Sequence, residues 1–240
     1  MKTLLTLIAL YRTDADEPCE GVEIIYSENN ESEKDFVTRA IKAAKGKYAV
    51  LIHQKFKLAD VNSLLNLLDK NSPDMFVFVG GTAIKTSVVK GAVKDCEDMF
   101  SCFILSVLSC KTILKSLYTP FLFIKSEVTF DEVNYSGLLI ASEEFSSKKA
   151  KLSKDIYSHA MNALCSRLVN FYLVAMVAIK EGRLDGKKLI DFDGRLKAEI
   201  VLYLTLEQNF TGAKLTKLRK KGFRISGLTA KKFRKLLNAQ

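Results

Sequence analysis

The sequence predicts an α/β fold with a mostly parallel sheet, followed by a helical appendage at its C-terminal end. Between residues 3 and 81, short apolar runs alternate with amphipathic helical patterns, which is typical of parallel strands covered by helices. Beyond about residue 153, apolar residues recur only at helical spacing. The apolar content of 48% and the charged content of 27% are those of a globular protein.

The first expected element is a buried strand in the apolar run over residues 3–11. This run is too short to span a bilayer. It is not interpreted as a signal peptide either, because acidic residues follow it instead of a small-residue cleavage site. A helix is expected to begin after Ser32, whose hydroxyl can cap it, and to end before Gly46. The other elements expected here are strands over 22–27, 48–52 and 74–81 and a helix over 59–70.

The remainder of the chain is less regular up to about residue 150. Residues 100–118 predict a strand followed by a short helix, and residues 119–145 predict another strand and a helix. A long helix is expected over 157–182 and a second one over 191–209. These patterns divide the chain into a sheet domain (1–150), a helical appendage (151–207) and a basic tail (208–240).

The basic tail carries the whole excess of positive charge. It has ten basic and no acidic residues, whereas residues 1–207 carry 27 of each. Gly222 and Gly227 divide it into amphipathic pieces that suit an anionic membrane surface or polymer, where each Lys or Arg contributes about 1 kcal/mol. Nucleic acid is the weaker alternative, because the tail offers only three aromatic residues for base stacking, Phe210, Phe223 and Phe233. The third alternative is a basic end that serves only solubility.

The candidate anion-binding residues of the tail are Lys217, Arg219, Lys220, Lys221, Arg224, Lys231, Lys232, Arg234 and Lys235.

The five cysteines indicate reduced thiols in a cytoplasmic protein. Their number is odd, they form no C-x-x-C pair, and two histidines cannot complete an ordinary zinc site with them. A cytoplasmic location with peripheral attachment to the inner membrane surface is consistent with this usage and with the basic tail. The sequence does not indicate an oligomeric state.

Two stretches carry a resemblance to a known family. They read "VEIIYSENNESEKDF" at 22–36 and "AAKGKYAVLIHQKFKLADVNSLLNLLDKNSPDMFVF" at 43–78. In order, spacing and the A-K-G-x-Y turn at 44–48, the chain resembles the family 2 glycosyltransferases, which have the GT-A fold. Residues 111–132 resemble a later stretch of that family, and the two C-terminal helices resemble the appendage of its polysaccharide-making members. The resemblance covers about residues 1–205.

The resemblance implies a GT-A-like, Rossmann-like fold and a nucleotide-sugar site. The implied reaction moves a sugar, with inversion, from a nucleotide diphosphate to a surface polysaccharide or a glycan or lipid-linked acceptor. Glu28 and Asn29 stand where the family has the two Asp that contact the base. His53 and Lys55 stand where it has the two Asp of its metal-binding D-x-D. Carboxylates suit Mg²⁺ or Mn²⁺ and a lysine repels them, so no divalent metal is expected.

The chemistry of the implied site therefore depends on cations of the protein itself. Lys55 can neutralise a leaving diphosphate, and His53 can add a donor. The alternative is that residues 53–55 form a solvated loop of a fold that has lost its chemistry.

The catalytic base is not placed by the resemblance. The Glu-Asp pair that supplies it in the family should follow residue 132, but residues 133–137 contain no acid. Asp131 and Glu132 are the candidates for a general base after a shift of register. Three functions stay open: a metal-independent glycosyltransferase, an inactive transferase-like module that binds a partner protein or glycan, and an anionic-polymer or membrane-surface binder that works through its tail.

Overall fold

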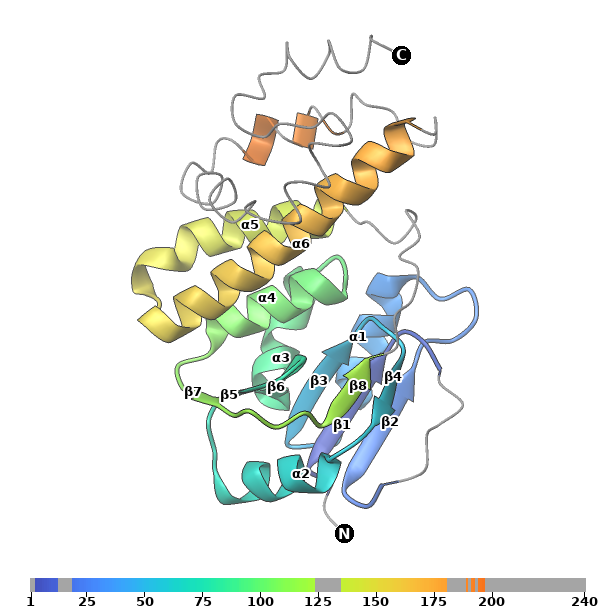
Figure 1. Ribbon diagram of the computed structural model, residues 1–240, viewed down its shortest axis with the longest axis vertical. Coiled ribbons are helices and arrows are strands. Elements are labelled where there is room, and N and C mark those ends of the chain that lie inside the picture. The colour runs from blue at the N-terminus through green and yellow to red at the C-terminus, as the bar shows by residue number, and fades with distance from the viewer. Residues whose placement is uncertain are drawn as a thin grey trace. The chain divides into compact units, whose positions relative to one another are not determined.

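The computed structural model describes residues 3–12, 19–123 and 135–180, together with 189, 191, 192 and 194–196 (Figure 1). They fall into two compact units. The first holds 3–12, 19–123 and 150–157, and the second holds the other described residues. Asp131, Glu132 and the basic tail lie outside the described residues, so the predictions made for them stay predictions.

The first unit contains a six-stranded, mostly parallel sheet in the order β2-β1-β3-β6-β5-β7. β1 is parallel to both of its neighbours, and β5 is parallel to β7. β6 alone is antiparallel to the strands beside it. The strands are β1 Leu5–Ala9, β2 Val22–Tyr26, β3 Tyr48–Ile52, β5 Met75–Phe78, β6 Gly81–Lys85 and β7 Ile113–Lys115. The predicted mostly parallel α/β sheet is thus confirmed.

Helices and a second sheet cover both faces of this sheet. The covering elements are α1 Glu33–Ala43, α2 Val61–Lys70, α3 Thr86–Ala92, α4 Met99–Ser109 and the antiparallel pair β4 Phe56–Leu58 and β8 Phe121–Phe123. On one face, α2, β4 and β8 share a core with β1 and β3. On the other, α1, α3 and α4 contact those same two central strands or one another. Every residue of β1 is therefore buried.

The prediction for residues 100–118 is wrong in its order of elements. The chain forms α4 first and the strand β7 afterwards. Apolar residues lie on every side of α4 and nine of its eleven residues are buried, so the helical period is hidden in the sequence. The signal that could have found the helix is its capping box, in which Asp98 accepts from the Ser101 N–H and the Ser101 hydroxyl accepts from the Asp98 N–H.

Two short strands, β4 and β6, were not predicted from the sequence. β6 follows β5 after a two-residue turn in which Gly80 has φ +87°, a conformation that favours glycine. The predicted cap of α1 is confirmed, because the Ser32 hydroxyl accepts from the Asp35 N–H at 3.1 Å.

The second unit contains α5 Tyr135–Lys148 and most of α6 Lys154–Lys180, the long helix that was predicted. Phe192 packs against Phe171 with the ring centroids 4.5 Å apart. Glu143 lies within α5 and pairs with Arg195. Among the described residues, no helix is both long and apolar enough to cross a membrane, and all five cysteines are free thiols.

A buried turn between α1 and β3 joins several elements of the first unit. The Gly46 N–H donates to the Thr6 hydroxyl at 2.9 Å, and the Gly46 carbonyl accepts from the Thr86 hydroxyl at 2.6 Å. The Thr6 hydroxyl in turn donates to Glu23 at 2.8 Å. A Cβ on Gly46 would lie 2.6 Å from the Thr6 nitrogen, which leaves no room for a side chain. The glycine of the A-K-G-x-Y turn is thus required by packing.

We therefore expect Gly46→Ala to lower the free energy of unfolding by about 2–3 kcal/mol, because the new methyl group meets backbone atoms that cannot move aside. Gly91→Ala is the matched control. An added Cβ at Gly91 in α3 meets nothing within 4 Å, so this change should be neutral or stabilising by up to about 1 kcal/mol. Denaturant unfolding of both variants measures the difference. Equal losses would contradict this account of Gly46.

Candidate functional site

The candidate site lies where β1, β2 and β3 end. The three strands are parallel and in register, with Ala9 paired to both Tyr26 and Ile52, so their carboxyl ends meet at one edge of the sheet. The chain passes from β1 to β2 on one side and reaches β3 on the other side of β1. This reversal is the topological switch point at which open α/β sheets bind ligands. The segments that leave this edge are residues 10–12, 27–31 and 53–55.

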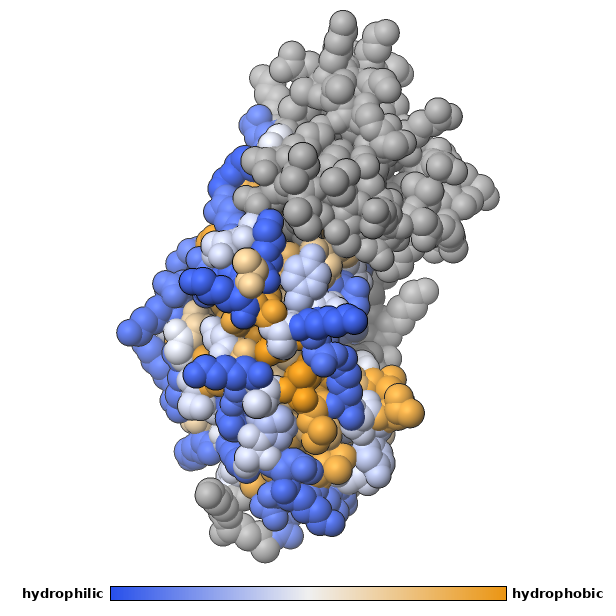
Figure 2. All heavy atoms as spheres, turned by 90° about the vertical axis from the view of Figure 1, so that its left-hand side faces the viewer, coloured by the Kyte–Doolittle hydropathy of each residue, from blue (hydrophilic) through white to orange (hydrophobic). Residues whose placement is uncertain are grey.

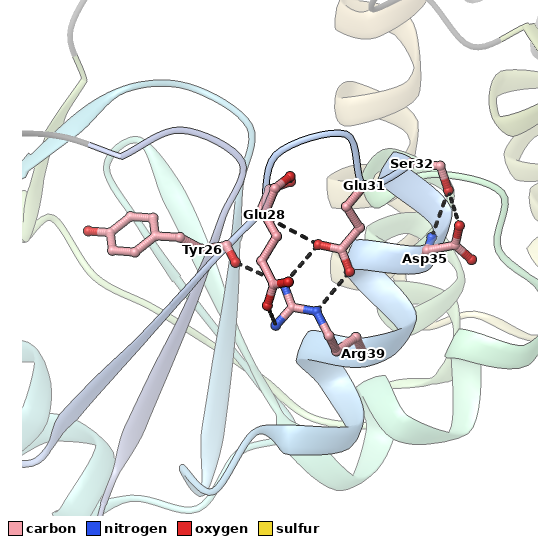
Figure 3. A network of polar contacts seen from close by, with 7 residues as sticks. Tyr26, Glu28, Glu31, Ser32, Asp35 and Arg39 are labelled. Atoms are coloured by element: carbon pink, nitrogen blue, oxygen red, sulfur yellow. Dashed lines mark hydrogen bonds and ion pairs between the residues drawn. The ribbon is translucent and has the colours of Figure 1, made fainter.

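An arginine on α1 holds the segment that follows β2 (Figure 3). The Arg39 guanidinium donates from Nε to Glu31 Oε1 at 2.7 Å and from Nη2 to Glu31 Oε2 at 2.8 Å. Nη2 also donates to the Tyr26 carbonyl at 3.0 Å. This fork joins the end of β2 to α1 and fixes the loop between them.

The same loop is tightened by its own backbone. The Glu28 N–H donates to Glu31 Oε2 at 3.2 Å, and Asn30 has φ +64°, which asparagine tolerates better than most residues. The hydrogen bonds from Arg39 hold the pKa of the Glu31 carboxyl below its ordinary value, and Glu31 correspondingly raises the pKa of Arg39. Glu31 is therefore a structural anion of this loop.

The structure brings the predicted nucleotide-binding residues to the same edge, in two groups. Glu28 and Asn29 follow β2, whereas His53 and Lys55 follow β3, and β1 lies between these strands. All four are exposed. The Glu28 carboxylate lies 3.4 Å from the Arg39 guanidinium, which already binds Glu31 at 2.7 Å. Residues 53–55, which follow Ile52 directly, contain no carboxylate.

Two further residues of the edge were missed from the sequence. The Arg12 guanidinium lies over the Tyr26 ring, 5.5 Å from its centroid, as in a cation–π contact. The Tyr26 hydroxyl is buried and has no hydrogen-bond partner in the part of the chain that the structure describes. Their positions could have identified them in the sequence, because Arg12 follows the first strand and Tyr26 ends the second one.

The described residues offer no site for a metal ion. Over the described ranges, no cluster of three or more His, Cys, Asp or Glu side chains is placed to hold one. Among the described residues, no carboxylate forms an ion pair with Arg12 or Lys55 at this edge. The edge can therefore attract an anion through the protein's own cations.

No model of a known protein family matches the chain, and comparison with curated proteins and with solved structures gives no match either.

The Arg39–Glu31 contact makes stability depend on pH. Glu31→Gln should lower the free energy of unfolding at neutral pH by about 1 kcal/mol, after allowance for solvent screening. Because folding lowers the pKa of Glu31 from its ordinary 4.5, its contribution is present above that pH and is lost as the pH falls through the folded-state pKa. The difference between wild type and variant should therefore shrink in acid, as denaturant unfolding across pH would show.

Glu28→Gln is the control for this experiment. Glu28 is 72% exposed and lies 3.4 Å from Arg39, so its loss should change the free energy of unfolding by less than about 0.5 kcal/mol. A larger effect at Glu28 than at Glu31 would refute the assignment of roles.

Proposed function

We propose that the protein binds a nucleoside-diphosphate sugar at the carboxyl edge of β1, β2 and β3 without a divalent cation. The observation that carries the proposal is the presence of Arg12 and Lys55 at the switch point of the sheet, on segments that follow β1 and β3. A diphosphate is the anionic group that such a site suits, since arginine can bind its oxygens in a fork and lysine acts as a point charge.

The aromatic side chain beside Arg12 supports the same ligand class. The Arg12 guanidinium covers the Tyr26 ring, and the buried Tyr26 hydroxyl has no hydrogen-bond partner among the described residues. A ligand that binds Arg12 would approach this hydroxyl, which can donate to a phosphate or ribose oxygen. Asn29 and Glu28 are exposed at the same edge and are available to the polar groups of a base or sugar.

We further propose that the fold is GT-A-like and that the bound nucleotide sugar is a donor for transfer to a surface polysaccharide or glycolipid acceptor. The mostly parallel sheet and the packing role of Gly46 in the A-K-G-x-Y turn support this assignment. The reaction would proceed without a metal, with Lys55 stabilising the leaving diphosphate and His53 donating to it. Asp131 and Glu132 remain the proposed sources of a general base.

A second candidate is an inactive transferase-like module that binds a partner protein or a glycan. The observation that favours it is that the acidic side chains after β2 are already paired with a cation of the protein. Glu31 is held by Arg39, and Glu28 lies against the same guanidinium. Neither carboxylate is arranged as a free base for an acceptor hydroxyl.

Calorimetric titration with UDP and UDP-sugars, first in EDTA and then with Mn²⁺, tests the binding site. We expect the same affinity in both buffers. Lys55→Ala and Arg12→Ala should each weaken binding about tenfold or more, because each removes a cation from the diphosphate. Lys42→Ala is the matched control, since Lys42 is an exposed lysine on α1. Binding that requires Mn²⁺, or no binding at all, would overturn the proposal.

Sugar transfer then separates the two candidates. Turnover in EDTA that is lost in Lys55→Ala would support the transferase. Nucleotide binding with no transfer to any polysaccharide or lipid acceptor would support the inactive module.

A further inference from the structure

A group of large apolar side chains reaches the surface near the β7 edge of the six-stranded sheet. Leu117 is 92% exposed, and the other members of the group are between 37% and 55% exposed. We call this group the β7 apolar face, and it consists of Val79, Leu114, Leu117, Tyr118 and Leu122. Figure 2 views the molecule from the side on which Figure 1 shows β7, and apolar residues reach the surface there between hydrophilic ones.

Hydrogen bonds of the backbone hold the segments of this face together. The Val79 N–H donates to the Tyr118 carbonyl at 2.9 Å, and the Ser116 N–H donates to the Val77 carbonyl at 2.8 Å. The β5–β6 turn and the segment after β7 are thus adjacent. Leu122 lies farther along the same segment, in β8, where it pairs with Lys57 of β4. Leu114 and Leu122 are exposed from strands, and Leu117 lies between Ser116 and Tyr118, which these two backbone hydrogen bonds hold. No rearrangement is needed to expose the three leucines.

The segments that form the β7 apolar face, and strand β4 that pairs with β8, carry lysines and no acid. Residues 77–85, 111–123 and 53–58 contain five lysines and no Asp or Glu. Asp74 binds Lys85 at 2.9 Å, and Asp155 binds Lys115 at 2.6 Å. The three lysines that have no acidic partner among the described residues are Lys55, Lys57 and Lys111.

This arrangement of charge decides between the partners that an apolar face could have. A second copy of the chain, joined through the same face about a two-fold axis, would bring the same lysines against each other. An anionic lipid surface would instead accept the leucines among its acyl chains, the tyrosine at the level of the headgroups and the lysines at the phosphates. Each lysine near such a leaflet adds about 1 kcal/mol of attraction.

We propose that the β7 apolar face docks the protein on an anionic lipid leaflet, with Leu117 and Leu122 inserted and Lys57 and Lys111 against the headgroups. The overall charge of +10 attracts the chain to the same kind of surface. This inference does not depend on nucleotide binding, because it rests on the exposed apolar side chains and their lysines alone.

The chain contains no tryptophan, which allows a direct test with Leu117→Trp in the full-length protein. On phosphatidylcholine vesicles that contain about one-third phosphatidylserine, we expect the tryptophan emission to shift to the blue and to be quenched by brominated acyl chains. Vesicles of phosphatidylcholine alone, or high salt, should remove both effects. Lys42→Trp on α1 is the control and should keep the emission of a water-exposed indole, even when the basic tail holds the protein on the vesicles.

A double variant and its control measure how much the two leucines contribute to vesicle binding. Leu117→Ser combined with Leu122→Ser should weaken vesicle binding about tenfold or more, because two inserted side chains are lost. Lys42→Ala should leave it unchanged. Both leucines are exposed, so far-ultraviolet circular dichroism should show an intact fold in the double variant.

Two results would overturn the proposal. One is water-exposed Leu117→Trp emission on anionic vesicles, together with unchanged affinity of the double variant, since attachment would then involve only other parts of the chain. The other is a dimer in sedimentation experiments that the double variant abolishes, since the face would then bind a second copy.

Discussion

The fold depends on the hydroxyl of Thr6, a fully buried polar group in the central strand β1. It donates to Glu23 of β2 and accepts from the N–H of Gly46, so it joins the two strands that flank β1 through their amino-terminal ends. A buried hydroxyl without partners would cost about 1–3 kcal/mol, and here both of its hydrogen-bonding roles are satisfied. The carboxylate of Glu23 also accepts from the Lys45 N–H at 3.0 Å, which extends the same network to the end of α1.

The position of the candidate site follows from this contact. Parallel strands that are aligned at their amino ends and have five residues each also end together, and Ala9 is accordingly level with Tyr26 and Ile52. The segments that begin there therefore share one edge of the sheet. Arg39 then fixes the segment after β2, whereas the segment after β3 has its own short strand, β4, to hold it. The edge is preorganised by backbone pairing more than by the side chains that would touch a ligand.

The sequence predicted the sheet and its central strands well because their physical signals are local. Continuous apolar runs, the Ser32 cap and the turn at Gly46 each lie within a few neighbouring residues. The order of α4 and β7 could not be read from periodicity, because a helix that is apolar on all sides has no period to show. The sequence indicated the positions of Arg12 and Tyr26 relative to their strands, but not their contact, which depends on the pairing of β1 with β2.

The electrostatic character of the edge is set by which charges are already paired. Glu31 lies 2.7 Å from Arg39, and this pairing removes the best-placed carboxylate from any ligand and leaves its charge balanced within the protein. Arg12, by contrast, contacts a neutral ring, which orients the guanidinium without cancelling its charge. A Mg²⁺ ion that accompanies a diphosphate is usually bound by the phosphates and by one or two carboxylates of the protein. Among the described residues, Glu31 is thus occupied by Arg39, whereas Arg12 keeps its charge for an anionic ligand, which is the arrangement that the proposed binding site uses.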